Sequence, residues 1–303
     1  MTSAGFTLVE TLIAMVLTMM LAGTAMALVM PASRASMVQP AQADVQQRAR
    51  VAAETIAREA AMAGAGLVAL PAAVGPSLGV PAVMPRRLGG LRGDGPDVAR
   101  SSALTLLSVP AGAAATTTAV AISAAAMQLT VTNAPACGAA VLCGFAAGQD
   151  VLVTDGSGHF DVFRITRVAG GVGTLRLHGS DLVGAYPAGA TVVPVVSRTF
   201  ERDAVSQQLR QYDGDQSDQP SVDGIADLVF SYFDADGAPL PLSQFADGPW
   251  RGAGTTRFDE DLLRVRMIRC SVRAQATEAS LRARVPAIGV SLDVAPRSLG
   301  GAR

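Results

Sequence analysis

A long apolar run opens the chain and leads into an amphipathic stretch. No charged residue occurs between Glu10 and Arg34, and a helix over residues 11–33 would be roughly 34 Å long at 1.5 Å per residue. That length spans the hydrocarbon core of a bilayer, which is about 30 Å thick. Beyond it, apolar residues recur at spacings of three, four and seven opposite charged ones, as on a helix that covers a core. This apolar set is Val38, Val45, Ala49, Ala52, Ile56 and Ala60.

The pattern therefore predicts a membrane-spanning helix over residues 6–30 and an amphipathic continuation over 31–66. Pro31 and Pro40 lie within this helix, and we expect each to kink or locally loosen it, because proline removes a backbone hydrogen bond. The glycines of the segment 62–66 end it. Residues 67–101 are rich in Pro and Gly without a clear period, and predict a loop-rich linker that packs over the rest of the chain.

Residues 102–303 carry short runs of strand-forming residues, many bounded by turn pairs such as Asp155-Gly156. In one run, Leu262–Arg273, the alternation of apolar and polar residues inverts near Met267, which predicts a bulge or a strong twist. Residues 111–126 fit either a strand or a loose loop. The predicted fold class is α+β, with a long N-terminal helix packed on an antiparallel β-sheet head. The predicted strands are Ala103–Val109, Met127–Thr132, Asp150–Thr154, Phe160–Val168, Thr174–Leu177, Thr191–Phe200, Val205–Tyr212, Ile225–Phe233, Leu262–Arg273 and Val290–Val294.

Glu10 is the residue of the apolar run that needs an explanation. A carboxylate inside a membrane segment is expensive and indicates a functional site with a partner. The string Gly5-Phe6-Thr7-Leu8-Val9-Glu10 before a long apolar helix resembles the class III signal of type IV pilins and pseudopilins. The resemblance implies that a membrane peptidase removes the leader, residues 1–5, and methylates Phe6. It also implies that Glu10 attracts the N-terminal amine of an adjacent subunit during assembly.

The alternative is an ordinary signal peptide or a plain anchor. An ordinary signal has a basic leading region, an apolar core of roughly 7–15 residues and a small-x-small cleavage site. Here the core is longer, and an acid follows directly after Gly5-Phe6. The leader does depart from the family, because it contains no Lys or Arg, and positive charge on the cytoplasmic side normally sets orientation.

The C-terminal half carries a second resemblance. Thr199–Asp234, with Trp250 and Leu262–Ile268, is similar to the PilW-type minor pilins and to the related J-type pseudopilins of type II secretion. This implies a pilin-like head and a minor pilin that joins a type IV pilus or its initiating tip complex. The alternatives are a J-type pseudopilin and, in another class, a bitopic envelope protein with a ligand-binding head.

The resemblance also implies partners and a location. The partners are other major and minor pilins or pseudopilins, the prepilin peptidase and inner-membrane lipid. The protein would cross the inner membrane once with a periplasmic head, and would later join a cell-surface pilus or a periplasmic pseudopilus. It implies no cofactor.

The cysteines fit an exported head. Cys137 and Cys143 bracket a short segment, and the oxidising compartment implied by the signal favours a disulfide between them. The alternatives are two reduced thiols or half of a metal site. A zinc site needs about four ligands, and His159 and His178 show no ligand spacing. Cys270 lies in a strand pattern and is expected to be a buried small hydrophobe.

Charge argues against nucleic acid as a partner. The net charge is −1 and all 24 basic residues are arginines, whereas nucleic-acid binders usually carry a clustered basic excess. The densest group of arginines is interrupted by Gly, Pro and Asp and is expected to form a solvent-exposed loop. This group is Arg86, Arg87, Arg92 and Arg100.

Candidate chemistry is sparse, and we expect no enzymatic activity. The chain has no His-Glu-x-x-His string, and its Gly-rich strings lack the Lys of a phosphate cradle. The one acidic group with metal-like spacing is Asp213, Asp215 and Asp218. It starts like an EF-hand calcium loop but lacks the distal Glu. Asp and Gly are also the usual residues of tight turns, so a plain hairpin turn is favoured over a calcium site.

Overall fold

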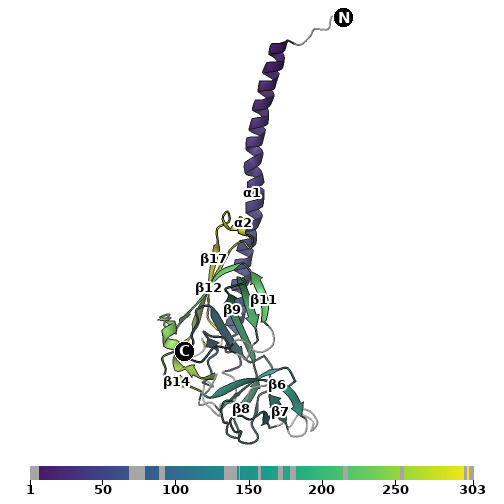
Figure 1. Ribbon diagram of the computed structural model, residues 1–303. Helices are drawn as coiled ribbons and strands as arrows, with labels where there is room; N and C mark the ends of the chain where they lie inside the picture. The colour runs from purple at the N-terminus through teal and green to yellow at the C-terminus, as the bar shows by residue number, and fades with distance from the viewer. Residues whose placement is uncertain are drawn as a thin grey trace.

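The computed structural model describes residues 7–67, 79–88, 93–132, 142, 144–155, 158–169, 173–177, 182–213, 218–252, 256–296 and 299. A single long helix, α1 (Leu8–Met62), projects from a head built of antiparallel sheets. In Figure 1 the N-terminal half of α1 stands clear of the head, while its C-terminal half runs into it.

Helix α1 is continuous over 55 residues. The kinks predicted at Pro31 and Pro40 do not interrupt it, because a proline deletes one backbone bond and the bonds on either side keep the helix together. At its C-terminal end the amide of Gly64 donates to the carbonyl of Leu107 at 2.7 Å. Gly66 has a φ of 73°, and a Cβ there would lie 2.6 Å from the Cβ of Val109. The helix end is therefore held directly against the sheet.

The apolar stripe predicted for the second half of α1 is confirmed. Val45, Ala49, Ala52 and Ile56 are all completely buried, and they belong to one hydrophobic core that includes residues of the five-stranded and the four-stranded sheets. Because five of the six predicted stripe residues are Ala or Val, the sheets can approach the helix backbone closely. The stripe is thus part of the core of the head.

Two antiparallel sheets pack against this half of α1. One has five strands and the other has four. The five-stranded order is β1 (Val83–Met84), β2 (Ala103–Ser108), β9 (Val196–Asp203), β10 (Gln208–Tyr212) and β11 (Asp218–Asp223). The four-stranded order is β13 (Pro239–Leu240), β12 (Ile225–Phe233), β16 (Met267–Ala274) and β17 (Ile288–Val294).

A six-stranded sheet forms a second unit, inserted between the paired strands β2 and β9. Its order is β3 (Thr116–Thr117), β8 (Thr191–Pro194), β5 (Asp150–Thr154), β6 (Phe160–Ala169), β7 (Thr174–Leu177) and β4 (Gln128–Thr130).

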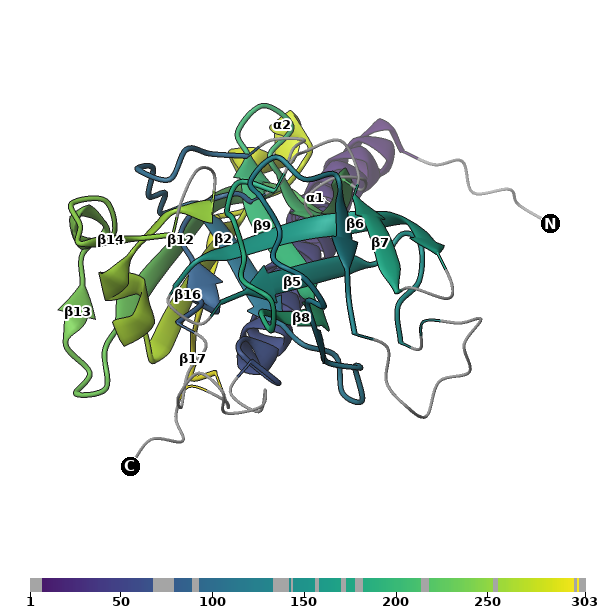
Figure 2. The same cartoon turned by 90° about the horizontal axis from the view of Figure 1, so that it is seen from below.

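The two edges of this sheet meet and close it into a barrel. Thr118 forms an antiparallel bridge with Val131, and the amide of Ala119 donates to the carbonyl of Thr130 at 2.9 Å. Residues such as Leu129, Val151 and Phe163 fill the barrel with a hydrophobic core of its own. The barrel lies at the end of the head farthest from the start of α1 (Figure 1), and Figure 2 views the head from that end.

Short elements complete the head. A two-stranded hairpin, β14 with β15, and the 3-10 helices η1 and η3 lie beside the four-stranded sheet, and the short helix α2 precedes β17. Their bounds are β14 (Trp250–Arg251), β15 (Phe258–Asp259), η1 (Leu242–Phe245), η3 (Glu260–Arg264) and α2 (Ala279–Arg282).

Two predicted strands differ from the structure in kind, beyond shifts of a few residues at the ends of others. The run Thr191–Phe200 divides at Val195, where β8 joins the barrel and β9 joins the five-stranded sheet. The run Leu262–Arg273 begins as η3, and only its second part, from Met267, is strand β16. The bulge predicted within this run is therefore wrong. The alternation inverts because the first residues follow a 3-10 helix, which has three residues per turn, and the others follow a strand.

The interpretation of the arginines in the linker as a solvent-exposed loop is wrong for Arg86. Arg86 is only 2% exposed, and its guanidinium donates to the carbonyl of Arg257 at 2.7 Å. Its neighbours Val83 and Met84 form β1 and are buried in the main core. The described part of the linker from residue 79 onward is thus part of the head. Arg92 lies outside the described residues.

The other two arginines of the group form an ion-pair network. Asp94, whose side chain is 3% exposed, accepts from Arg87 at 2.7 Å and from Arg100 at 2.8 Å. Arg87 also reaches Glu201 of β9 at 3.1 Å. These pairs hold residues 86–88 and 93–100 against the sheet.

Candidate functional site: the exposed N-terminal helix

The first part of α1 exposes an apolar surface around its whole circumference. Residues Leu8–Ala27 have a mean hydropathy of 1.8, and none of their side chains is buried. The exposed fractions of Leu8, Met19 and Leu21 are 80%, 72% and 70%. Apolar surface in water costs about 25 cal/mol per Å², so this segment is suited to a membrane or to apolar contacts with another protein. By length and composition it can cross a bilayer.

The N-terminus of α1 is closed by a capping box. Thr7, in an extended conformation, is the N-cap residue, and its hydroxyl oxygen accepts from the amide of Glu10 at 3.3 Å. In return the amide of Thr7 donates to the Glu10 carboxylate at 3.2 Å. Both partners satisfy amides that a helix N-terminus leaves unpaired. The Thr-x-x-Glu spacing of Thr7 and Glu10 is the sequence pattern of a capping box. It was not among our predictions, which related Glu10 only to the membrane and to assembly.

The capping box leaves part of the Glu10 carboxylate available. The bonds from the amide and the hydroxyl of Thr7 both end on Oε2, and Oε1 makes no hydrogen bond with any described residue. A carboxylate has about four acceptor positions, so it can cap its own helix and also receive an ammonium group. Gly5 and Phe6, the predicted processing residues, lie outside the described residues, and their roles stay predictions.

The acidic group predicted as a turn or a weak calcium site lies at the β10–β11 hairpin. Tyr212 pairs with Asp218 across the two strands, so the segment between them connects a hairpin. Asp213 lies 3.3 Å from the guanidinium of Arg164 in the barrel strand β6, which engages its charge. Asp215 lies outside the described residues. The position favours the turn interpretation.

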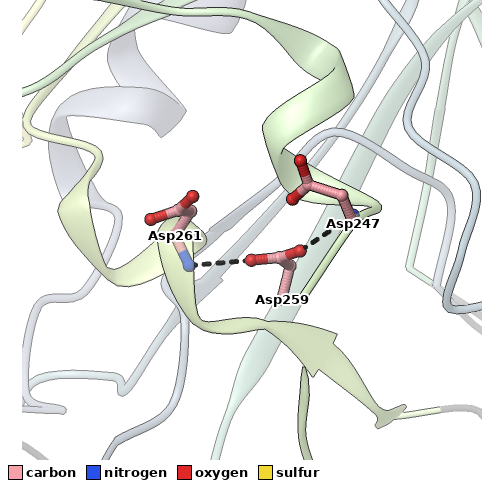
Figure 3. Close-up of side chains that lie close together, drawn as sticks. All are labelled: Asp247, Asp259 and Asp261. Atoms are coloured by element: carbon pink, nitrogen blue, oxygen red, sulfur yellow. Dashed lines mark hydrogen bonds between the residues drawn. The ribbon is translucent and has the colours of Figure 1, made fainter. Parts of the chain in front are cut away.

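A different acidic trio has the geometry to hold a cation. Asp247, Asp259 and Asp261 each offer a carboxylate oxygen within 4.8 Å of the others (Figure 3). The fully buried Asp259 accepts from the amides of Asp247 at 3.2 Å, Gly248 at 2.6 Å and Asp261 at 3.0 Å. Asp261 also pairs with Arg264 at 3.0 Å. These bonds stabilise the buried charge of Asp259 and explain the cluster as the connection between the hairpin and η3.

Of the cysteines and histidines, the structure describes Cys270 and His159. Cys270 is 1% exposed in β16, which confirms its predicted burial, and desolvation raises the pKa of its thiol to about 12. Cys137 and Cys143 lie outside the described residues, so their disulfide stays a prediction. His159 is half-exposed just before β6, and its Nδ1 lies 3.1 Å from Asp155 Oδ2.

One motif match lies almost wholly outside the described residues. Gly75-Pro76-Ser77-Leu78-Gly79 reads Gly-x-Ser-x-Gly, the pattern of a nucleophile elbow, which requires a strand before the serine and a helix after it. From Gly79 the described chain leads into β1, and residues 79–88 contain no helix. The second half of that context is therefore not met, and we assign no catalytic role to the string.

Comparison with known proteins adds no family. No protein-family model matches the chain, and no curated protein matches it. The function is therefore inferred from the residues of this chain and their geometry.

Proposed function

We propose that this chain is a pilin-like subunit, a minor pilin that joins a type IV pilus or its initiating tip complex, or a J-type pseudopilin of a type II secretion system. The observation that carries the proposal is the division of α1. One half is apolar on every side and exposed, and the other half is buried on one stripe within the head. A subunit of this form has a head that folds by itself and a helix that needs other surroundings.

In this proposal the exposed half of α1 crosses the inner membrane and later packs against the helices of other subunits. The prepilin peptidase cuts after Gly5, so that Phe6 carries the new N-terminal amine. The free oxygen of the Glu10 carboxylate then accepts this amine from an adjacent subunit. Because the effective dielectric constant is low between apolar helices, such a pair is much stronger than in water. An unpaired carboxylate would be correspondingly costly.

The alternative, a bitopic envelope protein with a ligand-binding head, gives α1 and Glu10 a different role. Its helix would only anchor the head, and the charge of Glu10 would have no partner in a neighbouring subunit. Glu10 would then act mainly through the capping box that it forms with Thr7. The two functions are separated by removing the charge and the cap independently.

Two matched substitutions make that separation. Glu10→Gln removes the charge but keeps a side chain that serves in capping boxes. Thr7→Ala keeps the charge and removes the cap, at a cost of about 1 kcal/mol to the helix N-terminus. We expect Glu10→Gln to lower the amount of the protein in sheared filaments, relative to membranes, by an order of magnitude or more, equivalent to about 1.4 kcal/mol. Thr7→Ala should change this ratio by less than about a factor of three.

Immunoblots of both fractions measure the ratio, and the same blots report whether each variant is processed. An unchanged ratio for Glu10→Gln would remove the assembly role of the carboxylate. Equal defects in the two variants would assign the effect to the helix cap, as the anchor function requires.

A further inference from the structure

A polar groove of about 250 Å³ lies on the five-stranded sheet. It crosses three neighbouring strands, because one lining residue comes from β9, one from β10 and three from β11. The lining residues are Arg198, Gln211, Gln219, Pro220 and Ser221. Gln211 and Gln219 are direct cross-strand partners, so their amide groups lie side by side on the groove wall.

Arg198 is the one charged residue of this lining. It is half-buried in the central strand β9, and its Nε atom is buried without a hydrogen-bond partner. No described carboxylate lies within ion-pair distance of its guanidinium. Burying part of a charge without a partner is unfavourable, so a counter-ion at this point would lower the free energy of the folded protein.

The other half-buried arginines of the same sheet region are paired. Arg202, also on β9, donates to the carbonyl of Ile225 at 2.9 Å, and Arg210 of β10 pairs with Asp203 at 3.1 Å. Arg202 and Arg210 thus have hydrogen-bond or ion-pair acceptors within the protein, whereas Arg198 lines an open groove.

We propose that this groove binds a carboxylate group, with Arg198 as its counter-charge and the amides of Gln211 and Gln219 and the hydroxyl of Ser221 as further donors. The planar guanidinium matches the two oxygens of a carboxylate. A single cation suits a singly charged group, whereas a phosphate dianion would need more positive charge. The groove volume fits a small organic acid or an acidic side chain. The carboxylate can therefore come from a free acid or from a partner protein.

The test uses the full chain in detergent micelles, with acetate and the peptide acetyl-Ala-Glu-Ala-amide as probes. Acetyl-Ala-Gln-Ala-amide is the uncharged control, and inorganic phosphate is the competing anion. Titration followed by NMR should show chemical-shift changes at residues of β9, β10 and β11. Binding of acetate as strong as that of the Glu peptide identifies a free acid as the source, and stronger binding of the Glu peptide identifies an acidic side chain.

Arg198→Gln should weaken binding of the preferred carboxylate at least tenfold. Arg273→Gln, which alters an exposed arginine of β16 outside the groove, should leave it unchanged. Gln219 is exposed on the edge strand β11, so its substitution should leave the fold intact. Gln219→Ala should weaken binding about two- to fivefold. The proposal is overturned if neither acetate nor the Glu peptide binds at millimolar concentration. It is also overturned if the Gln peptide or phosphate binds as well as the Glu peptide and acetate. A third contradicting result is an unchanged affinity in both Arg198→Gln and Gln219→Ala.

Discussion

The ion-pair network around Asp94 makes the stability of the head depend on pH. Burial by itself would raise the pKa of this carboxyl, but hydrogen bonds from Arg87 and Arg100 outweigh it and lower the pKa from 3.8 to about 2. The Asp94 side chain is 3% exposed, and the backbone amide of Arg87 also donates to it at 3.0 Å. We therefore expect Asp94→Asn to destabilise the head, because it removes the charge that both guanidiniums surround.

The magnitude follows from the lowered pKa. At about 1.4 kcal/mol per pKa unit, a decrease from 3.8 to about 2 corresponds to roughly 2 kcal/mol of folding free energy at neutral pH. The side chain of Arg100 is 45% exposed, so solvent screens its share, and we expect about 1–2 kcal/mol. The carboxyl is more acidic in the folded state, so this stabilisation is present above the unfolded pKa, near 4, and is lost as pH falls through 2. At pH 3 roughly half of it should remain.

The assay is urea unfolding of a head protein, residues 31–303, followed by circular dichroism at pH 7, 5 and 3. The difference between the original protein and Asp94→Asn isolates the contribution of Asp94, because the other carboxyls titrate in both. Asp97→Asn is the matched control, since Asp97 has no ion pair with a described residue. A difference below about 0.5 kcal/mol at pH 7, or one that does not shrink at pH 3, would refute the role assigned to the network.

Two further predictions test the helix and the leader. Ile56→Ala in the head protein should lower the free energy of unfolding by about 2–5 kcal/mol, because Ile56 is fully buried in the core. Val51 lies on the same helix but is 40% exposed, so Val51→Ala should change this free energy by less than about 0.5 kcal/mol. Equal effects in urea unfolding would mean that the stripe does not contribute to the core. Gly5→Val should block removal of the leader, since a β-branched side chain would obstruct the expected cleavage, while Ser3→Ala should be processed normally. A mature-size band from Gly5→Val on an immunoblot would contradict the cleavage site.

The elements that were predictable from the sequence are those whose pattern depends on residues close in the chain. Strands β5, β7 and β12 have the predicted bounds, and the buried stripe of α1 follows the predicted spacing through Ile56. In a half-buried helix or strand, the spacing of apolar residues follows the period of the element and does not depend on which element it packs against. The capping box of Thr7 and Glu10 is equally local, and its spacing is present in the sequence.

Pairing between distant segments was decided only by the tertiary structure. The apolar run from Thr191 to Phe200 reads as one strand, yet Val192 lies in the barrel core and Phe200 in the main core. Which sheet each half joins depends on partners far away in the chain, namely β5 and β2. Closure of the barrel likewise depends on the bridge between Thr118 and Val131, which no local sequence pattern predicts.

The polar sites show the same difference between what the local sequence predicts and what the tertiary structure decides. The sequence predicted an exposed loop around Arg87 and Arg100, but it did not predict that Asp94 lies between the two guanidiniums with a side chain that is only 3% exposed. Arg198 occupies an ordinary strand position in the sequence, and only the neighbouring β10 and β11 turn it into the cation of a groove. Propensity and periodicity report the environment of a residue averaged over one or two turns. The partners of a charge are set by the packing of whole sheets, so they became visible only in the assembled head.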